Sequence, residues 1–183
     1  MTTTTLRWSD ALALDLPLMD ETHQEFVELL GQAERAPDAA LVPAWHALVS
    51  HTEAHFGQED RWMAATGFAS ANCHSLQHRA VLRAMREGLL PGRDAVQQCA
   101  LIREMAAALG PWFVQHARSM DAALALHLRG VGYDPETGQV HAPDALPQAL
   151  ITRCGSVGCG ERQATQEPAT IAGASDAPAA MPA

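Results

Sequence analysis

Histidine and acidic side chains recur at intervals of four residues in segments that otherwise have the pattern of amphipathic helices. The stretch HTEAHFGQED, residues 51–60, places His51, His55 and Glu59 on one helix face, because residues four apart are neighbours on a helix surface. Polar groups on a buried face are costly unless they are paired or bind something. This face is therefore either solvated or part of a site that needs these groups.

The hydrophobic pattern predicts helices and no strands. The expected helices begin at about residue 20 and at residues 39, 71 and 94, and they end near residues 35, 65, 88 and 129. Candidate N-cap residues are Asp20 or Thr22, Asp38, and Asp94. Pro111 lies inside the last helix and is expected to kink it. Because short turns join these segments, we expect an all-α fold, an antiparallel up-down-up-down four-helix bundle.

Composition divides the chain into three parts. We expect residues 1–19 to form an irregular N-terminal arm, residues 20–129 the bundle, and residues 130–183 a flexible, low-complexity tail rich in Gly, Pro and Ala. The cysteines are scattered, which favours reduced thiols over a disulfide framework; they are Cys73, Cys99, Cys154 and Cys159.

Charge and hydropathy exclude several classes of partner. A net charge of −9 argues against nucleic acid and against anionic membranes as partners. No stretch approaches the ~20 apolar residues that a membrane span requires. The N-terminal sequence lacks the pattern of a signal peptide, so we expect a cytoplasmic protein.

A bundle of this topology brings ligand-type side chains from all four helices to one level. The set comprises five imidazoles and two carboxylates: His23, His55, Glu59, His74, His78, His116 and Asp121. Any one pair alone is more typical of a solvated surface, but agreement in level across four helices favours a site. Imidazoles bind Zn, Cu, Fe or Ni, and carboxylates can bridge two cations. The set is too large for one ordinary coordination shell, so the pattern predicts a dinuclear metal centre.

Two further features refine this interpretation. The five-residue step from His116 to Asp121 turns ~500° on an ideal helix, so we expect a π-bulge or a helix end between them. His51 continues the stripe of ligands and is expected outside the ligand set. The remaining histidines and nearby acids are expected to be solvated: His46, His127, His141, Glu53 and Asp60.

Four motifs together resemble the hemerythrin family, and most closely its bacterial single-domain members. They are MDETHQEF, HFGQEDRWM, HSLQH and WFVQHARSMD, and the resemblance covers roughly residues 6–128. It implies a non-heme di-iron centre with a bridging oxo or hydroxo group that binds dioxygen reversibly. It also implies that one iron is bound by His74, His78 and His116, the other by His23 and His55, with Glu59 and Asp121 bridging both.

The expected function is dioxygen storage, delivery or sensing rather than enzymatic turnover. Alternatives at the same site are a di-iron peroxidase or oxidase and a metal-handling regulatory module. Ferritin-like oxidases use Glu-x-x-His, and this sequence contains no such motif. The expected partner is dioxygen, and an electron donor that re-reduces the site could be a second. Met63 and Trp112, each four residues from an expected ligand, are candidates for lining the dioxygen pocket.

Overall fold

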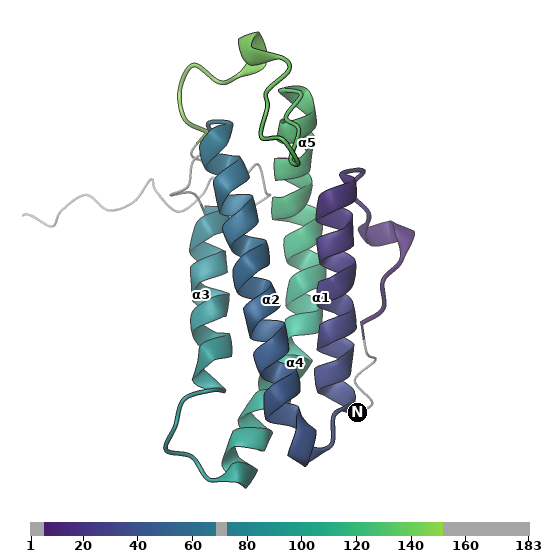
Figure 1. Cartoon of the computed structure of the whole chain (residues 1–183), viewed down its shortest axis with the longest axis vertical. Coiled ribbons are helices and arrows are strands. Elements are labelled where there is room, and N and C mark those ends of the chain that lie inside the picture. Colours follow the sequence, from purple (N-terminus) through teal and green to yellow (C-terminus); the bar gives the residue numbers. More distant parts are fainter. Residues whose placement is uncertain (1–5, 69–72, 152–183) are drawn as a thin grey trace, which may run out of the picture.

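Four antiparallel helices form the body of the computed structural model, which describes residues 6–68 and 73–151 (Figure 1). They are α1 (Pro17–Arg35), α2 (Asp38–Ala65), α3 (Cys73–Glu87) and α4 (Ala95–His116). The last helix continues through a π-helical turn, η2 (Ala117–Asp121), into α5 (Ala122–Gly130). The predicted all-α, up-down-up-down bundle is confirmed.

The helix ends agree only in part with the predicted caps. Asp94 is confirmed as an N-cap, because its carboxylate accepts the backbone N–H of Gln97 at 2.8 Å. Asp38 is not a cap; it is the first residue of α2, and its carboxylate pairs with Arg103 at 2.6 Å. Asp20 lies in the first turn of α1, where it accepts backbone N–H groups of the preceding arm. The helix therefore begins at Pro17, earlier than expected, since proline suits the first turn of a helix.

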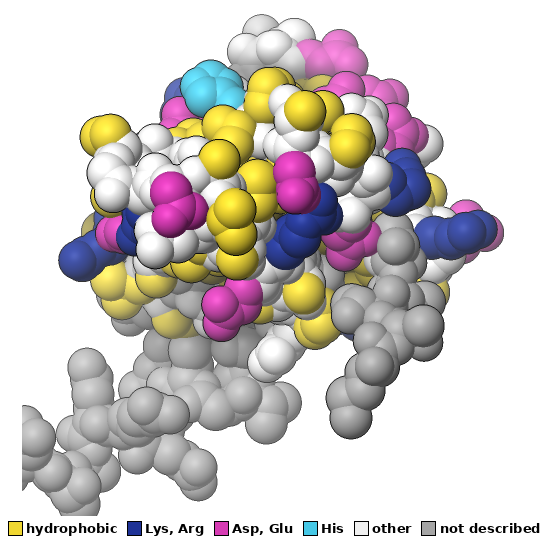
Figure 2. All heavy atoms as spheres, turned by 90° about the horizontal axis from the view of Figure 1, so that it is seen from below, with side chains coloured by type: hydrophobic (Ala, Val, Ile, Leu, Met, Phe, Trp, Pro, Cys, Tyr) yellow, Lys and Arg dark blue, Asp and Glu magenta, His cyan; other side chains and the backbone are white. Residues whose placement is uncertain are grey.

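The third connection lets α4 reach the level of the other segments that carry the predicted ligands. Figure 1 shows that the chain descends past the end of α3 before α4 begins, so the lower part of α4 overhangs its neighbour. Pro111 lies within α4, which continues without interruption to His116. Figure 2 views this lower end, where apolar side chains mix with acidic and basic ones. Exposed Leu90 and Val96 belong to this region of the loop and the start of α4.

Two apolar clusters fill the bundle on either side of the level at which the histidines lie. The lower cluster contains Phe26 and Leu30 of α1, Trp45 of α2 and Ile102 and Phe113 of α4. The upper cluster is formed by Leu16, Met19, Trp62, Met63, Phe68, Leu124, Ala125 and Leu128. A polar layer between two such clusters is shielded from solvent along the bundle axis.

The segment after residue 130 packs back onto the bundle. Val131 is buried, and the backbone N–H of Tyr133 donates to the carbonyl of Leu128. The N–H of Ile151 donates to the carbonyl of Gly67 at 2.9 Å, which brings the chain to the α2–α3 turn. Residues 131–151 thus contact the bundle, although only Val131 among them is buried, and a flexible tail stays a prediction. Residues 152–183, with Cys154 and Cys159, lie outside the described residues.

The remaining expectations on composition can be checked for part of the chain. Cys99 is a buried free thiol, as expected of scattered cysteines. Within residues 6–68 and 73–151, none of the helices combines the length and the apolar character that crossing a bilayer requires.

Candidate metal centre

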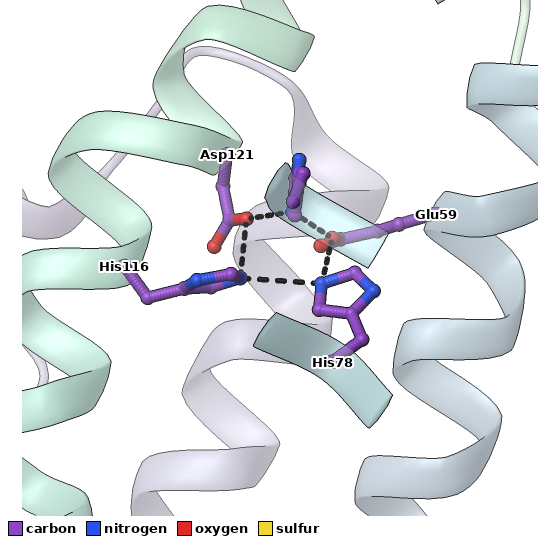
Figure 3. A group of neighbouring side chains, drawn as sticks. Glu59, His78, His116 and Asp121 are labelled. Atoms are coloured by element: carbon purple, nitrogen blue, oxygen red, sulfur yellow. Dashed lines mark hydrogen bonds and ion pairs between the residues drawn. The ribbon is translucent and has the colours of Figure 1, made fainter. Parts of the chain in front are cut away.

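All of the predicted ligand-type side chains meet in one buried layer of the bundle. Figure 3 shows Glu59 from α2, His78 from α3, His116 from α4 and Asp121 from η2 pointing toward one another. The donor atoms form two groups in which each lies within 4.8 Å of the others. One group is Glu59, His74, His78, His116 and Asp121, and the second is His23, His55 and Glu59.

Helix geometry explains how each side chain reaches this layer. His55 and Glu59 on α2 are four residues apart and lie on one inward face of that helix. His74 and His78 do the same on α3. On the last helix, the π-helical turn Ala117–Asp121 widens the backbone between the two ligand positions. A π-helical turn holds one residue more than an α-helical turn, so Asp121 lies on the same side of the helix as His116. The Asp121 carboxylate lies 3.1 Å from His116 Nε2. The predicted bulge is confirmed.

Glu59 lies at the junction of the two groups. Its Oε1 is 2.8 Å from His55 Nε2 and 3.8 Å from His23 Nε2. Its Oε2 is 3.2 Å from His74 Nε2 and 3.3 Å from His78 Nε2. One carboxylate oxygen therefore faces each group, which is the arrangement a bridging carboxylate requires.

Asp121 spans the groups in the same way. Its Oδ1 lies 2.9 Å from His74 Nε2 and 3.1 Å from His116 Nε2. Its Oδ2 lies 3.3 Å from His23 Nε2. Two carboxylates thus separate a set of three imidazoles from a set of two.

The burial of this cluster shows that it fits cations. None of the seven residues is more than 3% exposed. Buried atoms without a hydrogen-bond partner include His23 Nε2, Glu59 Oε2, His74 Nε2 and both carboxylate oxygens of Asp121. Unpaired polar atoms in an apolar interior are costly. Inward-facing nitrogen and oxygen lone pairs at this spacing match the ligands of first-row transition metals.

Without a cation, protons offset part of the negative charge. Burial opposes charging of His74, but the close approach of its Nε2 to the Asp121 and Glu59 carboxylates and their negative charges raise its pKa from 6.5 to about 10. The same balance raises the pKa of His23 to about 9. Burial opposes ionisation of Glu59 and Asp121 as well, yet the surrounding histidines hold the pKa of each carboxyl well below its usual range. Both carboxylates are ionised, so cations would displace protons from the imidazoles.

Aromatic rings enclose the histidines. Phe56 stacks on His78 with ring centroids 3.9 Å apart, and Trp112 stacks on His116 at 4.6 Å. Phe113 places its edge against His23 at 5.1 Å. These contacts restrict imidazole rotation and keep water from the layer. Of the two predicted pocket-lining residues, Trp112 is half-buried against the His116 ring, and Met63 is buried in the upper cluster.

Two residues outside the predicted ligand set are closer to it than expected. Asp60, expected at the surface, is half-buried with Oδ1 3.4 Å from His78 Nδ1. Gln77, which sequence analysis did not single out, has its Oε1 3.2 Å from His116 Nδ1. The only sequence signal for either is that it adjoins a ligand position. His51 lies outside both groups, as expected, and its Nε2 is 3.1 Å from the Thr22 carbonyl.

Three other histidines were expected to be exposed to solvent, and two of them are. His46 and His141 are exposed, as predicted, and so is Glu53, which pairs with Arg86. His127 is half-buried, because its Nε2 bonds to the carbonyl of Thr66 at 3.0 Å near the end of α2.

A four-helix bundle with two imidazole sets joined by shared carboxylates defines the hemerythrin type of protein. The model of the hemerythrin HHE cation binding domain matches residues 14–126, and the chain belongs to the hemerythrin family. A bacteriohemerythrin of Ralstonia nicotianae is 36% identical over 129 residues, which cover 70% of this chain and 93% of that protein.

More distant relatives carry the same name. A bacteriohemerythrin of Pseudomonas aeruginosa is 26% identical over 124 residues, covering 64% of this chain and 77% of that protein. A bacteriohemerythrin of Stenotrophomonas maltophilia is 25% identical over 124 residues, which cover 66% of this chain and 79% of that protein. No solved structure matches the chain significantly.

Proposed function

We propose that this chain binds dioxygen reversibly at a pair of iron ions held in the buried layer. His74, His78 and His116 bind one iron, and His23 and His55 bind the other. Glu59 and Asp121, whose oxygens face both sets, would be shared by the two ions, and an oxo or hydroxo group would be a further shared ligand. The observation that supports this proposal is the division of the donor atoms into two groups that share Glu59, with Asp121 also facing both.

The unequal numbers of histidines support dioxygen binding at one of the two positions. One position has three imidazoles, whereas the other has His23 and His55 alone, so we assign dioxygen to the latter. A ferrous pair held by these residues would supply the electrons for reversible binding of dioxygen. The neutral imidazoles add no negative charge, so the shared carboxylates are the anionic ligands that this chain contributes.

The rest of the chain fixes the ligands and excludes water. The lower and upper clusters close the layer along the bundle axis, and Phe56, Phe113 and Trp112 pack against the imidazoles. We propose that Trp112 and Met63 contribute to the lining of the dioxygen pocket. An apolar lining favours a small uncharged gas and limits side reactions with water.

Spectroscopy of the reduced protein tests this function. The protein is loaded with ferrous iron under argon, and visible spectra are recorded through repeated cycles of oxygen and argon. We expect two iron ions per chain and a charge-transfer band that appears with oxygen and disappears with argon. Irreversible oxidation in the first cycle would contradict reversible binding, and turnover with peroxide and an electron donor would favour the peroxidase alternative.

Two variants complete the test. We expect His78→Ala to bind well below two iron ions per chain, because it removes an imidazole from the larger group. His46→Ala is the matched control, since His46 lies on α2 but is exposed. Full iron retention by His78→Ala would refute the ligand assignment. A cytoplasmic location and a separate electron donor also stay predictions.

A further inference from the structure

Two polar side chains outside the ligand set contact the outer nitrogens of its histidines. Asp60 Oδ1 lies 3.4 Å from His78 Nδ1, and the hydroxyl of Ser75 donates to the same oxygen at 2.8 Å. Gln77 Oε1 lies 3.2 Å from His116 Nδ1. These contacts connect α2 to α3 and α3 to α4, so each joins a ligand to a neighbouring helix.

Among residues 6–68 and 73–151, such contacts occur only in the larger histidine set. The Nδ1 atoms of His23, His55 and His74 are buried without a hydrogen-bond partner. In contrast, the Nε2 atoms of His78 and His116, whose Nδ1 atoms do have partners, lie 3.2 Å apart and face the centre. The two metal positions therefore differ in how firmly their imidazoles are held.

An acceptor beside Nδ1 determines which nitrogen of a neutral imidazole carries the proton. A carboxylate or an amide oxygen accepts a hydrogen bond there but donates none, so the neutral imidazole carries its proton on Nδ1 and Nε2 keeps its lone pair. The contact also fixes the orientation of the ring and increases the basicity of the ligating nitrogen. Ser75 holds the Asp60 carboxylate in the position that this requires.

We propose that Asp60 and Gln77 are positioning residues that orient His78 and His116 and make the three-histidine position the tighter of the two metal sites. This inference rests on the ligand assignment of the proposed function. The position of His23 and His55 has no such contacts at Nδ1 and releases its metal first. Side chains that act through a ligand in this way change metal affinity by about 10- to 100-fold.

Metal release separates the two positions without depending on dioxygen chemistry. The full-length protein is loaded with zinc ions, which undergo no redox reaction, and mixed with excess chromophoric chelator in a stopped-flow instrument. We expect two ions per chain, released in a fast and a slow phase. His55→Ala should abolish the fast phase, which assigns it to the smaller set.

The decisive variants change the outer contacts alone. Asp60→Ala should accelerate the slow phase about 10- to 100-fold and leave the fast phase unchanged, and Gln77→Leu should act in the same direction. Asp60→Glu, which retains a carboxylate, should restore slow release. Glu53→Ala is the matched control, because Glu53 lies on the same helix and is exposed.

A spectroscopic measurement distinguishes positioning from general loosening of the fold. In the zinc-loaded protein, the proton signal of the His78 Nδ1–H group should move upfield in Asp60→Ala, because its charged acceptor is lost. Slow release within twofold of the unsubstituted rate, or equal acceleration of both phases, would overturn the inference. Binding of fewer than two zinc ions by the unsubstituted protein would instead refute the ligand assignment on which it rests.

Discussion

Replacing Glu59 with glutamine tests the side chain that the two groups of donor atoms share. Glu59→Gln preserves the size of a fully buried side chain and removes its negative charge. Because Glu59 belongs to both groups and a carboxamide has a single neutral acceptor oxygen, the change removes the charge and leaves at most one group with an oxygen from this position. Both metal positions should weaken, and the smaller group should weaken more.

The expected size of the effect follows from the contacts of Glu59. Residues that only orient a ligand already change metal affinity by about 10- to 100-fold, or about 1.4 to 2.7 kcal/mol. Glu59 places an oxygen beside both groups, so its loss should cost at least this much at each position. Only Asp121 Oδ2 then faces the smaller group, 3.3 Å from His23. We therefore expect one iron ion or fewer per chain.

The assay is iron content after anaerobic loading and desalting, measured with a colorimetric ferrous chelator against protein absorbance. Glu53→Gln, an exposed substitution on the same helix, is the control and should retain two iron ions. Circular dichroism should show unchanged helix content in both variants. Two iron ions in Glu59→Gln, released at the unsubstituted rate, would refute the bridging role.

Three further predictions concern stability. Since the folded-state pKa values of His23 and His74 are raised to about 9 and about 10, the folded chain binds these protons more tightly than the unfolded chain. The melting temperature of the metal-free protein should therefore fall as pH rises from about 6.5 toward 10, whereas that of the zinc-loaded protein, in which metal replaces these protons, should change less. Removing metal with a chelator at pH 7 should lower the melting temperature, because ligands that bind only the folded state stabilise it. Gly88→Ala should cost about 1–3 kcal/mol of unfolding free energy in a urea titration, because the added Cβ would lie 2.6 Å from Met105 Cε and 2.9 Å from Trp45 Nε1, whereas Gly130→Ala, with open space around it, should have little effect.

The ligand cluster could be predicted because helical spacing and chain topology act together. Spacing of four placed His55 with Glu59 and His74 with His78, and antiparallel topology brought these pairs to one level. The five-residue step from His116 was itself informative, because a widened turn is the local way to bring Asp121 inward. Periodicity specifies which face of a helix a residue occupies, and this was enough for the inward-facing ligands.

Contacts between helices were harder to predict, since they depend on the rotation of one helix against its neighbour. Asp60 lies one residue from the inward face of α2, which suggests a surface position. It is half-buried because α3 passes close enough for Ser75 and His78 to reach it. His127 is half-buried for the same reason, because its Nε2 bonds to the Thr66 carbonyl at the end of α2.

Low-complexity composition was also an incomplete guide after the bundle. The residues after Gly130 are rich in Gly and Pro, which predicts little packing. Backbone hydrogen bonds nevertheless connect Ile151 to Gly67, and Val131 is buried. Such contacts depend on backbone geometry in the described segment 131–151, which hydrophobic periodicity does not reveal.

The most direct test of the central claim is a crystal structure of the iron-loaded protein with anomalous diffraction data collected at the iron absorption edge. We predict two anomalous peaks in the buried layer, one beside the imidazoles of His74, His78 and His116 and one beside those of His23 and His55, with Glu59 and Asp121 between them. A single peak, or peaks outside this layer, would contradict the account.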